Sequence, residues 1–253
     1  MSSSLSRRKL IAGGLTAAGG AAGVAVAARL AARYGLIPPD WSGVWGPGET
    51  LTYACQRILT SRHSMAREFT RAEISRVAQV SGDPPRRDLY RHLLAGGFSD
   101  WRLSIDGLVA RPASFSLVDL KKFPSRSQIT EHTCEEGWSF VAEWTGVPFS
   151  YLMNLAGVLP QAKYAVFFPF DESWDSLDMA DALHSQTLIA YGMNGQDLPP
   201  DHGAPARLKV PRQLGYKSVK YLSHITLTDT LKNIGSGRGS SSPDAGYSWY
   251  AGI

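Results

Sequence analysis

One stretch, residues 128–140, constrains the fold of this chain more than any other. It begins with alternating polar and apolar residues and ends in a glycine-containing loop that carries His132, Cys134, Glu135 and Glu136. This alternation predicts a half-buried β-strand, and a loop after a strand presents side chains at the mouth of a pocket. A thiol there can serve as a nucleophile, a disulfide partner, a soft metal ligand or a small apolar side chain. Cys134 is therefore the first residue whose role has to be explained.

Local signals elsewhere predict short strands and helices. Strands are predicted over residues 101–109, 163–170, 187–193, 206–210 and 218–228. Helices are predicted over residues 50–62, 116–123 and 148–156, and a strand end with a helical turn over residues 177–184. Asn194 and Gly195 give the strongest hairpin signal, because both residues tolerate positive φ.

Several motifs in fixed order resemble a known family. His-x-Cys-x-Glu-Gly-Trp-Ser from residue 132 and Trp-Thr-Gly-Val-Pro from residue 144 resemble the molybdenum-binding segment of the sulfite oxidase family. Further motifs follow the family's order at residues 101–109, 194–200, 202–207 and 214–220, which is far more specific than one short match. The likeness is greatest to the small bacterial branch with the catalytic subunit of the periplasmic methionine sulfoxide reductase. The resemblance implies an α+β, sulfite oxidase-type molybdopterin-binding domain of mixed β-sheets with short flanking helices.

The resemblance also implies a cofactor and a set of site residues. Family members hold molybdenum through a pterin dithiolene and one cysteine thiolate, so a molybdenum-molybdopterin cofactor with Cys134 as metal ligand is expected. Glu136 and His132 are expected to manage protons near the metal, although His132 is equally compatible with a structural role at a strand end. The residues expected to bind the pterin are Arg67, Glu68, His202, Arg207, Ser218, Val219 and Lys220.

Basic residues cluster near the expected phosphate site. Four of them lie within fourteen residues of sequence, beside a glycine and a serine: Arg207, Arg212, Lys217, Lys220, Gly215 and Ser218. Guanidinium forks and backbone amides suit a phosphate group, whereas Lys209 is expected to be solvated. The chain has Pro169 and His202 where methionine sulfoxide reductases have threonine and asparagine. The resemblance therefore does not fix the substrate.

Four segments are expected along the 253 residues. They are a twin-arginine signal or possible anchor at residues 1–33, an arm with helices at 34–97, the molybdopterin-binding catalytic core at 98–230 and a tail at 231–253. The Gly/Ser-rich residues 235–242 are expected to be mobile. The aromatic end with Tyr247, Trp249 and Tyr250 is expected to dock back on the surface.

The amino-terminal sequence predicts export. Arg7 and Arg8 precede an uncharged apolar run at residues 10–28, which is typical of a twin-arginine signal and predicts a periplasmic protein, with an uncleaved membrane anchor as the alternative. The sequence has no haem-attachment motif, so electrons are expected from a membrane cytochrome b-type subunit or a soluble cytochrome. A monomer or a heterodimer with the membrane partner is expected. The net charge of +4, without a nucleic-acid-binding motif, argues against a nucleic-acid partner.

The carboxylates after the cysteine bear on the substrate. Glu135 and Glu136 would repel doubly charged sulfite, so the sequence favours reduction of a small S-oxide or N-oxide by oxygen-atom transfer. A sulfite-oxidising enzyme of the same family is the first alternative.

A protein without molybdenum is the second alternative. It would be an exported binding module, or a zinc protein with Cys134, His132 and distant histidines such as His184 as ligands. Cys55, the other cysteine, is expected to be a small buried residue. A disulfide between Cys55 and Cys134 is also compatible with an oxidising compartment and would exclude the metal role.

Overall fold

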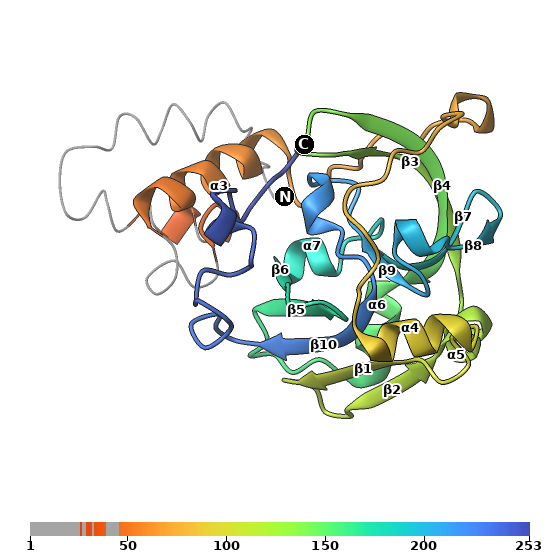
Figure 1. Cartoon of the computed structure of the whole chain (residues 1–253). Helices are drawn as coiled ribbons and strands as arrows, with labels where there is room; N and C mark the ends of the chain where they lie inside the picture. Colours follow the sequence, from red (N-terminus) through yellow and green to blue (C-terminus); the bar gives the residue numbers. More distant parts are fainter. Residues whose placement is uncertain (1–25, 27–28, 32, 39–45) are drawn as a thin grey trace.

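The computed structural model describes residues 26, 29–31, 33–38 and 46–253 (Figure 1). Most of the predicted signal segment and part of the predicted arm lie outside these residues. Within the described ranges, no helix is both long enough and apolar enough to cross a bilayer. The elements described below begin with helix α3, Pro47–Leu59.

One sheet of five strands has the order β2-β1-β10-β5-β6. Its strands are β1 (Arg102–Gly107), β2 (Ala113–Ser116), β5 (Tyr164–Pro169), β6 (Asp175–Asp178) and β10 (Leu222–Thr228). β1 and β10 pair in parallel and the other neighbours pair antiparallel, so the sheet is mixed. β10 begins later than the strand predicted from residue 218, because Tyr221 adopts a φ of 56°, which interrupts an extended strand.

The second sheet is antiparallel and carries the cysteine loop. β3 (Arg126–Thr133), β4 (Ser139–Pro148), β7 (Leu188–Met193) and β8 (Gln196–Asp197) are neighbours in that order, and β9 (Arg207–Lys209) pairs with β7. The β3–β4 ladder continues to the pair Thr133 and Ser139, so the connecting loop holds Cys134 at the end of the sheet. Asn194 and Gly195, with φ of 51° and 77°, confirm the hairpin between β7 and β8.

Short helices flank the sheets. They are α4 (Asp88–Ala95), α5 (Leu117–Lys122), α6 (Phe149–Ala156), α7 (Met179–Ala182) and the 3-10 turns η1 (Arg71–Glu73), η2 (Pro200–His202), η3 (Gly215–Lys217) and η4 (Pro243–Ala245). Ser116 starts α5 through a capping box with Asp119, and Gly157 ends α6 with a φ of 68°. Short helices around two sheets confirm the predicted α+β class.

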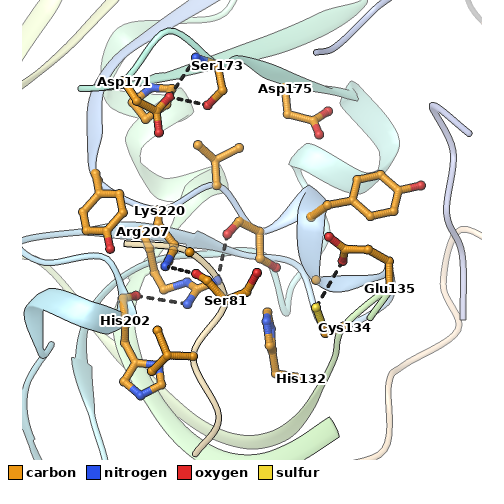
Figure 2. Close-up of a pocket in the computed structure, with 18 of the residues that line it drawn as sticks. Ser81, His132, Cys134, Glu135, Asp171, Ser173, Asp175, His202, Arg207 and Lys220 are labelled. Carbon is orange, nitrogen blue, oxygen red and sulfur yellow. Dashed lines mark hydrogen bonds between the residues drawn. The ribbon is translucent and has the colours of Figure 1, made fainter. Parts of the chain in front are cut away.

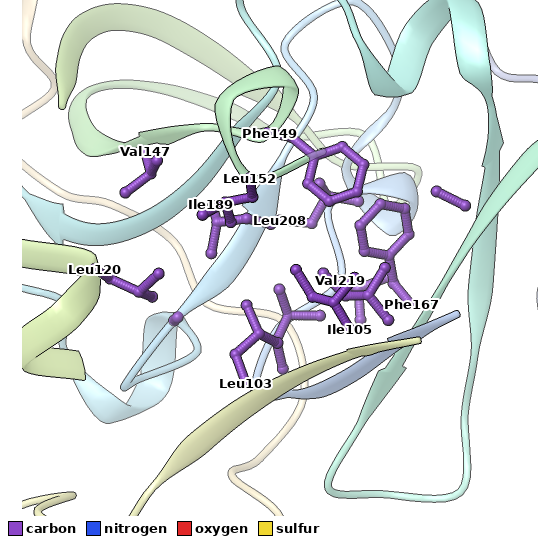
Figure 3. Packing of buried hydrophobic residues seen from close by; sticks show 14 of the residues in the cluster. Leu103, Ile105, Leu120, Val147, Phe149, Leu152, Phe167, Ile189, Leu208 and Val219 are labelled. Carbon is purple, nitrogen blue, oxygen red and sulfur yellow. The ribbon is translucent and has the colours of Figure 1, made fainter. Parts of the chain in front are cut away.

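The main core joins the two sheets (Figure 3). Leu103 and Phe167 of the first sheet share one buried cluster with Val147 and Ile189 of the second, and all four are fully buried. Burial of apolar side chains contributes about 25 cal/mol per Å² of surface removed from water. The two sheets are therefore stabilised as one body, which gives the loops at their ends a rigid support.

The carboxy-terminal tail, whose residues 235–242 are predicted to be mobile, makes specific contacts with this body. Ser241 Oγ donates a hydrogen bond of 2.9 Å to the carbonyl of Trp174. Trp249 and Tyr250 are buried, which confirms that the aromatic end docks, whereas Tyr247 is exposed. Glycine and serine content predicts a flexible chain only where no anchor follows, and here two aromatic side chains anchor the segment.

Cys55 is exposed on α3, so its expected burial is wrong. The helix turns Tyr53 and Arg57 toward the body of the protein, and Cys55 lies between them on the solvent side. Cys134 is buried, and both cysteines are free thiols. The alternative of a disulfide between them therefore finds no support in the structure.

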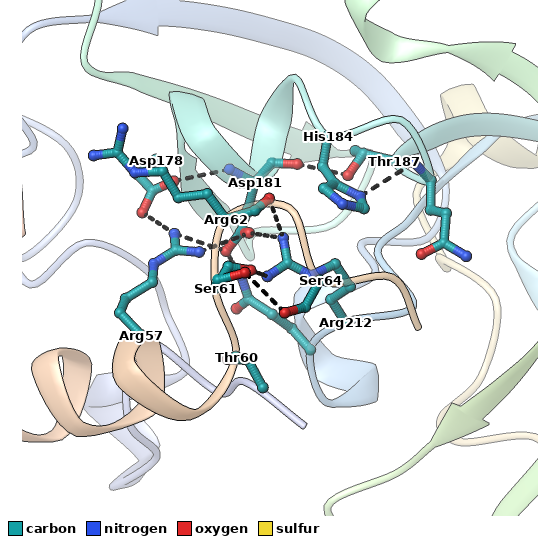
Figure 4. Close-up of polar contacts among 12 residues, drawn as sticks. Arg57, Thr60, Ser61, Arg62, Ser64, Asp178, Asp181, His184, Thr187 and Arg212 are labelled. Atoms are coloured by element: carbon teal, nitrogen blue, oxygen red, sulfur yellow. Dashed lines mark hydrogen bonds and ion pairs between the residues drawn. The ribbon is translucent and has the colours of Figure 1, made fainter. Parts of the chain in front are cut away.

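A buried ion network fastens α3 to the core (Figure 4). Arg57 of α3 bonds Asp178 at 2.5 Å and Asp181 at 3.0 Å, with both carboxylates almost fully buried. Arg212 bonds the same Asp181 oxygen at 3.0 Å and the carbonyl of Ser61 at 2.6 Å. Each charge in this network has an opposite charge within hydrogen-bond distance, so its desolvation is offset locally.

Replacing Arg57 by methionine should lower the free energy of unfolding by about 3–5 kcal/mol, because two buried carboxylates lose their main counter-ion. Arg91→Met is the matched control, since Arg91 pairs with Asp88 in full exposure and should change stability by less than about 0.5 kcal/mol. Urea unfolding of both variants measures the difference. Equal effects would contradict a structural role for the network.

Candidate cofactor-binding site

A pocket of about 290 Å³ lies where the cysteine loop, the segment around η2 and β9, and the segment from η3 to β10 meet (Figure 2). Parts of the loops 79–83 and 169–175, with residues 241–242 of the tail, complete the walls. Figure 2 shows Asp171, Ser173 and Asp175 on the wall opposite His132 and Cys134. Segments from most of the described chain thus build one site.

Cys134 is fixed by its own loop. Its backbone N–H donates to the carbonyl of Trp138 at 2.9 Å, and its carbonyl accepts from the N–H of Gly137 at 3.1 Å. The thiol donates to Glu135 Oε2 at 3.4 Å. Burial, followed by the negative charge of Glu135, raises the pKa of the Cys134 thiol to about 11. Without a bound metal, Cys134 is therefore a protonated thiol at neutral pH, and binding a soft metal would displace its proton.

His132 forms the floor beside the cysteine. Its ring packs among Phe140, Trp138 and Trp144, with centroid distances of 5.2, 6.3 and 6.1 Å. Burial, with the nearby charge of Lys209, lowers the pKa of His132 well below its usual value, so the ring is neutral at pH 7. A Cβ on Gly215 would lie 2.9 Å from His132 Nε2, so only glycine fits there without a shift.

Three basic side chains at the site lack an acidic partner among the described residues. Arg207 donates to the carbonyls of His202 and Ser218 at 3.0 and 2.8 Å. Lys220 lines the pocket and donates to backbone carbonyls only, including that of Ser81 at 2.7 Å. Lys209 lies behind the pocket wall, where its Nζ donates to a backbone carbonyl at 2.9 Å.

Burial dominates the electrostatics of these three groups. It lowers the pKa of Arg207 to about 10. It also lowers the pKa of Lys220 to about 8, and there the positive charge of Arg207 adds to the effect of burial. It lowers the pKa of Lys209 well below its usual value, and Lys209 is only 1% exposed, so its expected solvation is wrong. All three residues of β9 are buried, and a pattern of only three residues did not indicate this burial.

The other two cations of the predicted basic cluster are neutralised. Arg212 pairs with Asp181, and Lys217 pairs closely with Asp175. Both therefore belong to the structural ion pairs of the fold. The contrast with Arg207 and Lys220 separates the basic residues that stabilise the body from those left free to bind an anion.

Unpartnered polar atoms of two pocket-lining residues point to a ligand. Tyr221 Oη and Trp174 Nε1 are buried, and neither has a hydrogen-bond partner within the described part of the chain. Buried polar atoms are normally paired, so each exception calls for an explanation. A thiol, unpaired cations and unused hydrogen-bonding atoms together fit an anionic ligand that carries a soft metal, as molybdopterin does.

Seven of the ten residues predicted for the site come together here. These are His132, Cys134, His202, Arg207, Ser218, Val219 and Lys220. Glu136 instead accepts from Trp138 Nε1 at 2.9 Å and does not line the pocket, whose cysteine loop contributes Glu135.

The remaining predicted residues, Arg67 and Glu68, lie away from the pocket. Arg67 pairs with Glu73 at 3.1 Å and Glu68 pairs with Arg126 at 2.5 Å, which uses both as ordinary ion-pair groups. His184 does not line the pocket either, and the described residues contain no group of three or more His, Cys, Asp or Glu that could hold a metal ion. The proposed zinc ligands are thus not assembled.

The sequence did not single out several lining residues. Glu135 was visible as the neighbour of the cysteine, whereas Ser81, Trp174, Asp175 and Tyr221 carried no local signal. Their place depends on loop paths and on tail docking, which a single sequence does not reveal.

The two fully buried lysines provide a matched test of this electrostatic account. Lys209→Met should leave the stability of the cofactor-free protein unchanged or raise it, because it removes a buried charge without a counter-ion. Lys217→Met should lower the free energy of unfolding by about 3–5 kcal/mol, because it leaves the buried Asp175 carboxylate without its counter-ion. Urea unfolding measures both, and equal destabilisation would show that the Lys209 charge is compensated.

Comparison with known proteins identifies the family to which this chain belongs. The model of the oxidoreductase molybdopterin binding domain matches residues 94–233, more than half of the chain. The putative protein-methionine-sulfoxide reductase subunit YedZ1 of Azospira oryzae is 38% identical over 154 residues, covering 61% of this chain and 56% of that protein. The protein-methionine-sulfoxide reductase catalytic subunit MsrP of Campylobacter jejuni is 33% identical over 146 residues, covering 51% and 49%.

A solved structure of an oxidoreductase also resembles this chain. The sulfane dehydrogenase SoxCD from Paracoccus pantotrophus matches with a TM-score of 0.50 and 30% identity, over 52% of this chain and 39% of that one. The chain spans about half the length of the curated relatives it matches. The family match over residues 94–233 includes the cysteine loop, the β9 segment and the η3–β10 segment. The chain therefore belongs to the oxidoreductase molybdopterin-binding domain family, as its resemblance to the sulfite oxidases and their methionine sulfoxide reductase branch predicted.

Proposed function

We propose that this protein is an exported molybdenum-molybdopterin oxidoreductase that reduces an S-oxide, with methionine sulfoxide as the first candidate substrate. One observation carries the proposal: the pocket joins a buried thiol, Cys134, to Arg207 and Lys220, which have no acidic partner among the described residues. The names of the two curated relatives point to the same substrate.

The residues of the pocket are suited to hold the cofactor. Cys134 would provide the thiolate for molybdenum, while Arg207, Lys220 and the backbone at Ser218 and Val219 would bind the phosphate. His202, beside Arg207, offers a further ring nitrogen. When bound, the cofactor supplies oxygen-atom transfer coupled to electron exchange.

The protons for the reaction need a local source. Reduction of an S-oxide to a thioether and water consumes two electrons and two protons for each oxygen removed. His132 and Glu135 are the proposed proton-handling groups, because both line the pocket and Glu135 Oε2 already accepts the hydrogen bond of the Cys134 thiol. Glu135 replaces the predicted Glu136 in this role.

Carboxylates near the pocket disfavour an anionic substrate. Asp83, Asp171, Asp201 and Glu135 all line it. A neutral S-oxide avoids the repulsion that a doubly charged sulfite would meet. Oxidation of sulfite or of sulfane sulfur is the second candidate, favoured by the likeness to the sulfane dehydrogenase.

The redox partner and the location also belong to this proposal. Electrons would come from a membrane cytochrome b-type subunit, with a soluble cytochrome as the alternative, since the sequence has no haem-attachment motif. Arg7, Arg8 and the apolar run that follows support export to the periplasm by the twin-arginine pathway.

The function is tested by ranking substrates with the purified, molybdenum-loaded protein. Reduced viologen dye should be oxidised fastest with methionine sulfoxide, more slowly with trimethylamine oxide, and ferricyanide should not be reduced by sulfite at a comparable kcat/KM. Cys134→Ala should lose activity by at least about a thousandfold, because the metal loses its protein ligand. Sulfite as the best substrate would overturn the reductase assignment in favour of the second candidate.

Acid should weaken the cofactor-free fold through His202. Burial and the charges of Arg207 and Lys220 lower the pKa of His202 to about 4, whereas an unfolded histidine titrates near about 6.5. Between these values only the unfolded chain binds the proton, so stability falls as pH falls through this window. His202→Gln should remove part of this slope, and added inorganic phosphate should flatten it in the wild type, since an anion favours the charged ring. Urea unfolding at several pH values is the measurement, and an unchanged slope in both tests would contradict an anion site at His202.

A further inference from the structure

Helix α3 carries an apolar stripe on its exposed face. Leu51 is 65% exposed, Leu59 is 78% exposed, and Cys55 lies exposed between them. Residues four apart lie on one side of an α-helix, so the three side chains form a continuous row. Figure 1 shows α3 at the edge of the molecule, away from the two sheets. Single exposed leucines are common, but a row at helical spacing is the pattern of a binding face.

The stripe cannot turn into the protein core, because the opposite side of α3 is fixed. Tyr53 packs with Trp249 and Tyr250 of the tail, and its hydroxyl donates to Asp178 at 2.7 Å. Arg57 holds the same side through the buried ion network. The exposed row is thus a permanent surface of the folded protein.

A second apolar row precedes α3. Val26, Leu30 and Tyr34 are 55%, 38% and 43% exposed, again four residues apart. Gly35 lies against the guanidinium of Arg62, where a Cβ would come within 2.0 Å of Nη2, and Arg62 follows the end of α3. This contact brings the segment with the second row next to the end of the helix.

The charges beside the two apolar rows, and the sequence that precedes them, indicate what contacts these rows. Arg29 and Arg33 are exposed within the second row, and cations beside apolar side chains suit the anionic headgroups of a bilayer. Directly before them the sequence has the uncharged apolar run of residues 10–28, which is long enough to enter a membrane. Apolar rows, flanking arginines and a preceding apolar run together match the chemistry of a lipid surface.

We propose that α3 and the segment before it lie on the surface of a phospholipid bilayer, with Leu51, Cys55 and Leu59 in the apolar boundary. Arg29 and Arg33 contact the lipid phosphates. The face would hold the enzyme body at the membrane in one orientation. This inference does not depend on the identity of the substrate.

Cys55 offers a direct probe. An environment-sensitive fluorophore attached to the native full chain should label Cys55, because Cys134 is buried, and mass spectrometry verifies the position. With vesicles of phosphatidylglycerol and phosphatidylethanolamine, the emission should shift to the blue and iodide quenching should decrease. Leu51→Glu with Leu59→Glu should abolish both changes. Val118→Glu, a matched substitution of an exposed apolar residue on α5, should leave them intact.

A second label separates contact by α3 from anchoring elsewhere. A fluorophore at Val118→Cys in a Cys55→Ser chain should keep its aqueous emission when the protein floats with the vesicles. The proposal is overturned if the Cys55 label also remains aqueous in floating protein, which would mean attachment by the amino-terminal run alone. It is equally overturned if the chain does not float. Unchanged near-ultraviolet circular dichroism of the Leu51→Glu, Leu59→Glu variant confirms that the fold is retained.

Discussion

Buried positive charge without a carboxylate counter-ion is the constraint on which this structure depends. Arg207 and Lys209 lie almost fully buried in one short strand, and their polar contacts are mainly to backbone carbonyls. Removing an ion from water costs several kcal/mol unless an opposite charge offsets it. The shared apolar core of the two sheets offsets that cost. The ion pairs of Arg57 with Asp178 and Asp181 also hold α3 against the core.

The topology places this charge beside the reactive thiol. β9 contributes only three residues to the second sheet, but Lys209 donates from it to the carbonyl of Glu131 near the end of β3, and Arg207 lines the same pocket as Cys134. Arg207 and Lys209 also lie 5.1 Å from the ring of Trp144, which gives their charge partial compensation. A bound anionic ligand would complete this compensation, so the same side chains would determine both ligand binding and the stability of the fold.

Sequence alone was sufficient for features that arise from local chemistry. The short helix that begins after Ser116, the helix that ends at Ala156 and the Asn194-Gly195 turn were all readable, and the position of Cys134 after a strand followed from alternation. Features that arise from tertiary packing were not readable. Nothing local indicates that Lys209 is buried, that Glu135 rather than Glu136 faces the pocket, or that Arg67 and Glu68 form ion pairs elsewhere. Docking of the aromatic end was predicted, but the contacts that residues 235–242 make with the body were not readable, since glycine and serine content does not record tertiary contacts.

The central claim is that the pocket holds molybdenum through Cys134 and the pterin phosphate through its unpaired cations. Molybdenum K-edge X-ray absorption on protein purified from a molybdenum-replete host tests it most directly. The account predicts a metal with sulfur neighbours, one fewer in Cys134→Ser, with the pterin still released on denaturing that variant. A molybdenum environment that is identical in the two proteins, or native folded protein without molybdenum, would contradict the assignment of Cys134.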